Sequence, residues 1–222
     1  MPLRALARTA GANKPRFVRQ LPEQRRRALI AATIECLKRF GHEGLSIRTI
    51  SAQAGVSVGL INHHFPNKDE LIAAAYRHFN GELMAVFRSA VERAPGEDPR
   101  ARLHAFFQAH FSPPNLDQDV LAVWVVFWGM YRHSRHIQRV HRDNLQEYVQ
   151  LLRGMLGELM KQERPGARLE LRLPAIGLNA LLDGLWLEYC LEPGHFRPAE
   201  AVALCEAWVD NLLSRTDRSA LE

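Results

Sequence analysis

The fold of this 222-residue chain is decided by residues 46–65, which read SIRTISAQAGVSVGLINHHF. Ser46 can cap a short helix, and Gly55 supplies the positive φ that a tight turn requires. Ser57 can then cap a second short helix that runs through His64. A short helix, a glycine turn and another short helix form a helix-turn-helix, whose second helix enters the major groove of DNA. The alternative is a pair of ordinary helices joined by a glycine turn.

Exposed positions in and around this motif are the candidate DNA contacts. The second helix offers a hydroxyl, a methyl-bearing side chain and an amide to base edges, and its two histidines can meet phosphates or bases. Cationic side chains before and after it suit phosphate contacts, and the second cation adds its charge to the exposed N–H groups of a helix start. The predicted DNA-binding residues are Ser46, Arg48, Ser57, Val58, Asn62, His63, His64 and Lys68.

The charge distribution favours a nucleic-acid partner for the same end of the chain. Residues 1–68 contain 12 Lys and Arg against 3 Asp and Glu, whereas residues 69–222 contain 17 against 21. Such an excess of positive charge attracts a polyanion, because phosphate neutralisation and counterion release drive nucleic-acid binding. A basic tail that only keeps the protein soluble is the alternative.

Helical periodicity continues on both sides of the motif, and no useful length alternates with the period of a strand. Before the motif, a helix starts at Pro22 and stops at Gly41. After it, Asn67 and Glu70 have the form of a capping box that opens a long helix, which ends at residues 94–99. Five further helices are expected over about 99–111, 117–133, 135–162, 173–191 and 198–215.

The predicted fold is therefore all-α, with about nine helices. It divides into a flexible basic arm (1–20), a three-helix helix-turn-helix domain (21–68) and a larger helical domain (69–222). Apolar stripes on the last two helices predict a homodimer, because paired DNA half-sites require two recognition helices. The alternative is that both stripes face the core of one protomer. The stripe positions are Leu178, Leu182, Leu185, Tyr189, Val202, Cys205, Val209 and Leu212.

Composition argues against a membrane or secreted protein. No stretch approaches the roughly 20 apolar residues of a bilayer span. The N-terminus lacks the apolar core and cleavage pattern of a secretory signal. Three cysteines without C-x-x-C spacing argue against a disulfide framework or a cysteine zinc site. A reducing cytoplasm is the expected location.

Motifs for catalysis and for metal binding are missing from the sequence. It has no glycine-rich phosphate loop, nucleophile elbow or paired-carboxylate pattern. The histidines His133, His136 and His141 do not form a zinc motif, and the arginines among them would repel a cation. We therefore expect neither an enzyme nor a metal sensor, and no cofactor. A helical adaptor without DNA binding is the alternative from another class.

The run GVSVGLINHHFPNKDEL at residues 55–71, followed by a long helix, resembles the TetR family of one-component repressors. Most members of that family place Tyr before the final Phe of the recognition helix, whereas this chain has His64, whose imidazole could replace the tyrosine at a phosphate. Residues 120–156 and 179–191 resemble the BetI-like subgroup, whose founding members repress choline-to-betaine genes. The resemblance implies a repressor of double-stranded operator DNA with a small-molecule effector. It leaves the effector, and the direction of its effect on DNA binding, open.

Aromatic residues of the larger domain form the candidate effector site. Trp124, Trp128 and Tyr131 share one helix face, because their spacing is i, i+4 and i+7. Aromatic walls beside a carboxylate suit a quaternary ammonium ion through cation–π attraction. A plain aromatic core, or a site for an unrelated hydrophobic or aromatic metabolite, is the alternative. The predicted effector-binding residues are Phe107, Phe111, Trp124, Phe127, Trp128, Tyr131, Glu147, Tyr148, Asp183 and Trp186.

Overall fold

The computed structural model describes residues 22–113, 115–166 and 170–215, and over these ranges the chain is helical without strands. The predicted all-α fold is confirmed, while the predicted basic arm lies outside the described residues. None of the helices in these ranges is long and apolar enough to cross a membrane. The described helices are α1 Pro22–Phe40, α2 Ile47–Ala54, α3 Val58–His64, α4 Lys68–Glu92, α5 Pro99–His110, α6 Gln118–Tyr131, α7 Arg135–Glu163, α8 Arg172–Leu191 and α9 Pro198–Arg215.

Local sequence signals start and separate α2 and α3. The Oγ of Ser46 accepts a hydrogen bond from the backbone N of Thr49 at 3.0 Å. The Oγ of Ser57 accepts one from the backbone N of Leu60 at 3.3 Å. Between the two helices, Gly55 has a φ of 64°, in the left-handed region that favours glycine. The predicted order of helix, glycine turn and helix is therefore present.

A single long helix, α4, connects the two parts of the molecule. It is capped by Asn67, whose Oδ1 accepts a hydrogen bond from the backbone N of Glu70 at 2.8 Å. Its first half, including Tyr76, packs in one core cluster with α1, α2, α3, α6 and the start of α7. Its second half, including Met84, packs in another cluster with α5, α7, α8 and α9. The helix therefore belongs to both cores without a break.

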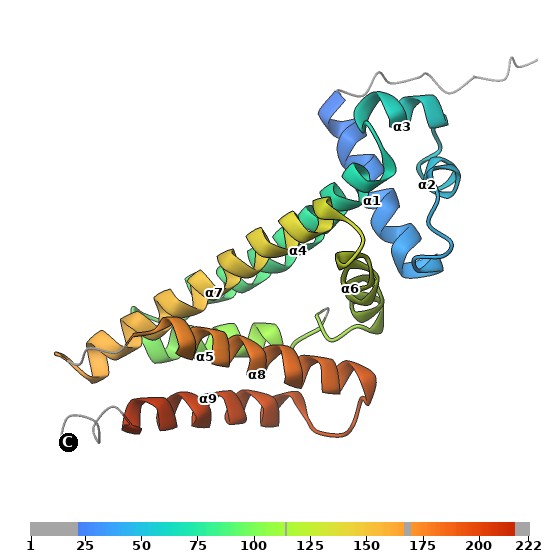
Figure 1. The fold of residues 1–222 in the computed structure, drawn as a ribbon. Coiled ribbons are helices and arrows are strands. Elements are labelled where there is room, and N and C mark those ends of the chain that lie inside the picture. Colours follow the sequence, from blue (N-terminus) through green and yellow to red (C-terminus); the bar gives the residue numbers. More distant parts are fainter. Residues whose placement is uncertain (1–21, 114, 167–169, 216–222) are drawn as a thin grey trace, which may run out of the picture.

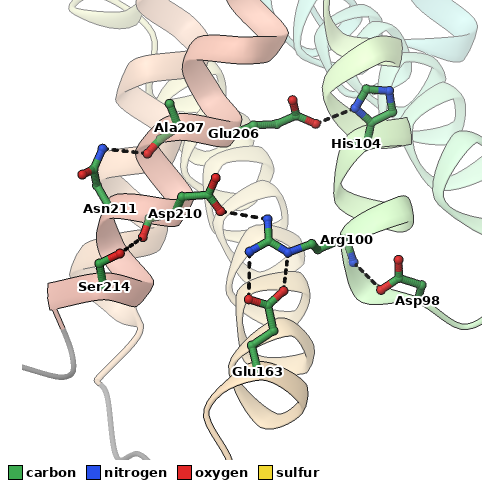
Figure 2. Close-up of polar contacts among 9 residues, drawn as sticks. All are labelled: Asp98, Arg100, His104, Glu163, Glu206, Ala207, Asp210, Asn211 and Ser214. Atoms are coloured by element: carbon green, nitrogen blue, oxygen red, sulfur yellow. Dashed lines mark hydrogen bonds and ion pairs between the residues drawn. The ribbon is translucent and has the colours of Figure 1, made fainter.

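The helices α8 and α9 lie side by side, at the end of the molecule far from α2 and α3 (Figure 1). At the surface, the guanidinium of Arg100 on α5 binds Glu163 of α7 and lies 2.8 Å from Asp210 of α9 (Figure 2). One turn further along α5, the Nδ1 of His104 lies 2.5 Å from the carboxylate of Glu206 (Figure 2). These polar contacts link α5 to α7 and to α9.

The predicted dimer stripes on α8 and α9 are wrong at most of their positions. Leu178, Leu182 and Cys205 are completely buried within a single protomer. Val202 and Val209 are also buried there. The stripes lie in the second core cluster, because α8 packs on α7 and α9 packs on α5 through these faces. Other apolar side chains of the two helices are exposed instead, namely Leu173, Ile176, Leu191 and Leu204.

All three cysteines of the chain are buried free thiols. Burial raises the pKa of Cys36, and it raises the pKa of Cys190 to about 11 and that of Cys205 to about 12. A thiol with a raised pKa is mostly protonated at neutral pH, and the protonated form is a poor nucleophile. These side chains therefore serve as small apolar groups of the core.

Candidate DNA interface and effector cavity

The recognition helix α3 presents an exposed face at one end of the molecule (Figure 1). Val58 is 39% exposed although it is apolar, and Asn62, one turn later, is exposed on the same face. The cap residue Ser57 and the next-to-last residue His63 are also exposed. A hydroxyl, an apolar group and an amide on a short exposed helix match the groups that read base edges in a major groove. Their individual base contacts stay predictions.

The two predicted phosphate-binding cations precede and follow α3 in the chain. Arg48 on α2 is exposed. Lys68 is half-buried, and its Nζ donates a hydrogen bond to the backbone O of Leu45 at 3.1 Å. Ser46 is exposed, but its hydroxyl already caps α2 and lies 2.7 Å from the hydroxyl of Thr49. Lys68 therefore also ties the start of α4 to the segment before α2.

The end of α3 is held by α1. The guanidinium of Arg26 donates a hydrogen bond to the backbone O of His64 at 3.4 Å and lies 4.3 Å from the centroid of the Phe65 ring. Desolvation lowers the pKa of His64, and nearby charges of His63 and of arginines on α1 lower it further. His64 is therefore mostly neutral at pH 7, so it can contact a phosphate through a hydrogen bond rather than through a full charge.

A cavity of about 100 Å³ lies among α4, α6, α7, α8 and the end of α5. A space of this size holds several non-hydrogen atoms, so it suits a compact metabolite. Its apolar walls consist mostly of aromatic rings from helices that are far apart in the sequence. The aromatic lining residues are Tyr76, Phe87, Trp124, Trp128, Tyr148 and Trp186.

Three tryptophans and one tyrosine build one side of the cavity. The ring centroids of Trp124 and Trp128, both on α6, are 5.8 Å apart. Trp186 on α8 meets Trp128 edge-on at 6.4 Å, and Tyr76 on α4 meets Trp124 edge-on at 5.6 Å. Trp128 is 40% exposed, which indicates that the cavity opens beside it. The structure thus brings together three tryptophans that the sequence places on two helices.

Asp183 on α8 is the carboxylate of the cavity. It is accessible to water, and its Oδ2 accepts a hydrogen bond from the Nδ2 of Asn179 at 2.9 Å. Surrounding protein atoms displace part of its hydration, which raises the pKa of Asp183 to about 6, while the hydrogen bond from Asn179 lowers it. The described residues that line the cavity include no Lys or Arg, so a bound cation would be the counterion of this group.

Two tyrosine–histidine pairs also line the cavity. The hydroxyl of Tyr76 lies 2.8 Å from the Nδ1 of His141, and that of Tyr148 lies 3.1 Å from the Nδ1 of His110. Burial lowers the pKa of His110 to about 4 and also lowers the pKa of His141. Burial raises the pKa of both tyrosines. At pH 7 both pairs are mostly neutral, so Asp183 supplies the charge of the cavity.

Four of the predicted aromatic residues do not line this cavity. Phe107 and Phe111 are buried in the second core cluster. Phe127 is fully buried and stacks on Tyr76 with a centroid distance of 4.2 Å, so it supports the wall from behind. Tyr131 is exposed at the end of α6. Phe127 therefore packs behind the cavity wall, while Phe107, Phe111 and Tyr131 lie outside the lining of the cavity.

Glu147, the second predicted carboxylate, does not line the cavity either. It is exposed, and its Oε1 lies 2.6 Å from a guanidinium nitrogen of Arg88. The next residue, Tyr148, is rotated by about 100° around the helix axis and does line the cavity. Of the two predicted carboxylates, only Asp183 therefore lies at the cavity.

Most polar lining residues were not among the predicted site residues. Asn80 and Asn144 are buried amides on long amphipathic helices, a place where polar side chains need a partner or a function. An asparagine among the apolar positions of such a helix could therefore have identified both residues from the sequence. Nothing in the sequence pattern marks the others, which come together only in the folded chain. The polar lining residues outside the prediction are Asn80, His110, Asn115, His141, Asn144 and Asn179.

Two family models match these two parts of the molecule. The model for bacterial regulatory proteins of the tetR family matches residues 29–75. The model for the C-terminal part of BetI-type transcriptional repressors matches residues 99–214. The first match includes the helix-turn-helix, and the second includes most residues of the cavity.

Similar proteins are regulators of the same kind. HTH-type transcriptional regulator BetI of Burkholderia thailandensis is 33% identical over 193 residues, covering 86% of this chain and 95% of the relative. The crystal structure of a proposed transcriptional regulator from Pseudomonas aeruginosa PAO1 is 49% identical, with a TM-score of 0.83 over 92% of this chain and 98% of that chain.

A more distant structure shares the fold. It is a proposed transcriptional regulator from Saccharomonospora viridis in complex with choline, 20% identical, with a TM-score of 0.71 over 85% of this chain and 96% of that chain. The family models, together with the BetI relatives, identify the chain through both its DNA-reading part and its larger helical part. The chain therefore belongs to the TetR family and is a DNA-binding transcriptional repressor with a BetI-type C-terminal domain, not an enzyme.

Proposed function

We propose that this repressor binds operator DNA as a homodimer and that a compact quaternary ammonium ion such as choline, held in the cavity, controls its affinity for that DNA. The observation that carries the proposal is one carboxylate, Asp183, in the same small cavity as three tryptophan rings. Tryptophan attracts cations more strongly than the other aromatic side chains, and more so where water is excluded. A methylated ammonium also has no N–H group that an aromatic wall would leave unpaired.

The charge of the cavity favours a cation over an uncharged metabolite. With a pKa of about 6, Asp183 is mostly ionised at pH 7, whereas the two lining histidines are mostly neutral. A hydrophobic ligand would cover this carboxylate without providing a counterion, which is costly. A cation neutralises it instead.

The comparisons support the same chemical class. The Saccharomonospora viridis protein shares the fold and holds choline in its crystal structure. The larger domain of this chain matches the BetI-type repressor model over residues 99–214, a segment that contains the tryptophans and Asp183. A quaternary ammonium effector is therefore the first ligand to test.

The helix α4 provides the link between effector and DNA. Tyr76 lines the cavity about two turns after Lys68, the first residue of α4. Residues 65–68 join this helix to α3, and Lys68 also bonds Leu45 ahead of α2. A ligand that prefers a second arrangement of α4 against α6 and α7 shifts the protein toward it. The two recognition helices of a dimer would then change their spacing relative to successive grooves.

The exposed apolar face of α8 and α9 is the proposed dimer surface. Leu173 and Ile176 of α8 and Leu204 of α9 are exposed in the single chain. A Cβ added at Gly177 of α8 would lie 3.2 Å from the ring of Trp208 on α9, so the two helices approach closely at this position. Two copies of such a helix pair can form a four-helix interface across a two-fold axis.

Calorimetric titration of the full-length protein with choline tests the effector. We expect binding, and we expect Trp128→Ala to weaken it by about fivefold to thirtyfold, the range that the loss of one cation–π contact gives. Val125→Ala is the matched control, because Val125 is exposed on the same helix but does not line the cavity. Choline should also change the affinity for operator DNA selected from a random pool. Absence of both effects would refute choline as the effector.

A further inference from the structure

The corner between α6 and α7 carries a dense group of cationic side chains. Residues 131–142, which read YRHSRHIQRVHR, contain four arginines and three histidines but no Asp or Glu. The rest of residues 69–222 contains 13 Lys and Arg against 21 Asp and Glu. The corner is therefore a positive segment in an otherwise acidic part of the chain. Its arginines are Arg132, Arg135, Arg139 and Arg142, and all four are exposed.

Three of these arginines form one outward face of α7. Arg135, Arg139 and Arg142 share a helix face, because their spacing is i, i+4 and i+7. Ile137 and Val140 are buried, and at 100° per residue they lie on the opposite side of the helix. The guanidinium groups of the first two turns of α7 are therefore directed toward solvent.

None of the four arginines forms an ion pair with another described residue, whereas Arg88 pairs with Glu147 and Arg102 pairs with Glu158. The first turn of α7 also contains no acidic residue. Like charges one turn apart repel each other, and a cation in the first turn of a helix opposes the helix dipole. The arginine group thus lowers the stability of α7, and its charges are available to an anion from outside the chain.

The backbone of this corner is held in place by local hydrogen bonds. The Oγ of Ser134 caps α7 by accepting a hydrogen bond from the backbone N of Ile137 at 3.4 Å. The Nε2 of Gln138 donates a hydrogen bond to the backbone O of Tyr131, the last residue of α6, at 2.8 Å. The arginines therefore extend from a defined turn between two helices.

The corner packs in the same core as the recognition helix. Met130 of α6 and Ile137 of α7 belong to the first core cluster, together with Leu29 of α1 and Ile61 of α3. The start of α7 lies beside the first half of α4, toward the end of the molecule that carries α2 and α3 (Figure 1). A duplex bound to α3 thus meets the same packed body that presents the arginines.

We infer that the α6–α7 corner is a second contact surface for DNA, which binds backbone phosphates next to the half-site that α3 reads. Arginine suits this partner, because its planar guanidinium can donate two parallel hydrogen bonds to one phosphate. Such contacts position a protein on the duplex and carry no sequence information of their own. An anionic membrane is another polyanion, but the repressor already binds a duplex at this end. The inference depends neither on the effector nor on the position of the dimer interface.

Fluorescence anisotropy of the full-length protein at several salt concentrations tests the surface, with an operator duplex selected from a random pool and with a random duplex. The corner variant is Arg135→Gln/Arg139→Gln/Arg142→Gln, in which glutamine removes the charges and keeps a good helix former. Each lost phosphate contact lowers the slope of log affinity against log salt by about 0.9. We expect a slope smaller by about 1 to 3, and at least about fivefold weaker binding of both duplexes near physiological salt.

The matched control is Arg93→Gln/Arg153→Gln/Arg172→Gln. It changes the net charge equally, at exposed positions of α4, α7 and α8 that flank the second core cluster. This control should keep the slope of the unchanged protein. The melting temperature of the corner variant should not fall, because the substitutions remove like-charge repulsion. If the corner variant is nevertheless unfolded, Arg139→Gln alone should lower the slope by about 1.

The outcomes are distinct. A smaller slope on both duplexes in the corner variant but not in the control supports the second DNA surface. Equal slopes for the unchanged protein and the corner variant overturn it, and so does the same loss in the control, which would indicate a general effect of net charge. A corner variant that keeps the DNA slope but no longer binds phosphatidylserine vesicles that the unchanged protein binds would assign the patch to a membrane and also overturn the inference.

Discussion

The pH dependence of choline binding should follow the ionisation of Asp183. Loss of hydration raises the pKa of this carboxyl group to about 6 in the ligand-free protein. If only the ionised form binds a cation, the competent fraction is about 0.9 at pH 7 and about 0.1 at pH 5. The affinity for choline should therefore fall about tenfold between these two pH values and level off above pH 7.

The sign of this effect is fixed by linkage. A bound cation stabilises the carboxylate and lowers its pKa, so binding releases a proton and strengthens as the pH rises through about 6. In the protein without ligand, the effect of Asp183 on folding stability has the opposite pH dependence. The folded-state pKa of Asp183 lies above its ordinary value of 3.8, so its contribution to stability is lost as the pH rises from 3.8 through about 6.

Calorimetry at pH 5, 6 and 7 on the unchanged protein and on Asp183→Asn tests this reasoning. The variant should bind choline at least about tenfold more weakly at pH 7 and should lose most of the pH dependence. Glu188→Gln, at an exposed position of α8 outside the cavity, should behave as the unchanged protein. The pKa of His110, about 4, lies below this range, and His141, whose pKa is also lowered, accounts for any small residual slope. An unchanged protein with the same affinity at pH 5 and 7, or a variant that keeps the tenfold change, would refute the assignment.

Other parts of the molecule give three further predictions. Lys68→Ala should weaken binding to all duplexes and reduce the salt dependence of that binding, whereas Asn62→Ala should mainly reduce the preference for operator over random DNA. Fluorescence anisotropy with both duplexes at several salt concentrations measures these effects. Equal losses of affinity on both duplexes for both variants would contradict the two roles. Ile176→Glu should give a monomer in analytical ultracentrifugation, whereas Val125→Glu, at an exposed position of α6, should leave the dimer intact. A dimer for both variants would place the interface elsewhere. Gly55→Ala should lower the free energy of unfolding by about 1–2 kcal/mol, because a side chain is strained in the left-handed region. Urea unfolding measures this change. An unchanged free energy of unfolding would show that the turn adapts.

The helix-turn-helix was predictable because its determinants are local. Ser46, Ser57 and Asn67 each accept a hydrogen bond from a backbone N three residues later in the chain. Gly55 takes a conformation that few other residues tolerate. Each of these contacts is contained in a few consecutive residues, so their order in the sequence is sufficient to identify them.

The cavity was predictable only in part, because it forms between helices that are distant in the sequence. Helical spacing identified Trp124 and Trp128, but it did not show that Phe127, one residue before Trp128, turns into the core against Tyr76. Asn115 follows α5 in a short connecting segment and belongs to no periodic pattern. Three hydrogen bonds hold Asn115 beside the cavity, two within the α5–α6 segment and one from Trp186 of α8. Only the folded chain reveals these hydrogen bonds.

The dimer stripes failed for a related reason. Apolar periodicity shows that a helix buries one face, but it does not show against which partner. Leu178 and Leu182 fit the pattern and are buried inside one protomer, whereas Ile176 and Leu204 are exposed. Both helices are apolar on more than one face, so the sequence alone could not assign the inner and the outer one.

The burial of Cys36, Cys190 and Cys205 makes the natural protein a convenient background for spectroscopic labelling. Alkylating reagents attack thiolates that they can reach, and these three side chains are neither accessible nor readily ionised. A single cysteine introduced at the exposed Gln53 of α2 would then carry a spin label or a fluorophore almost alone. In a dimer, the distance between the two labels would report the separation of the two helix-turn-helix motifs, with and without a small cation. The labelled protein would differ from the natural one at a single position.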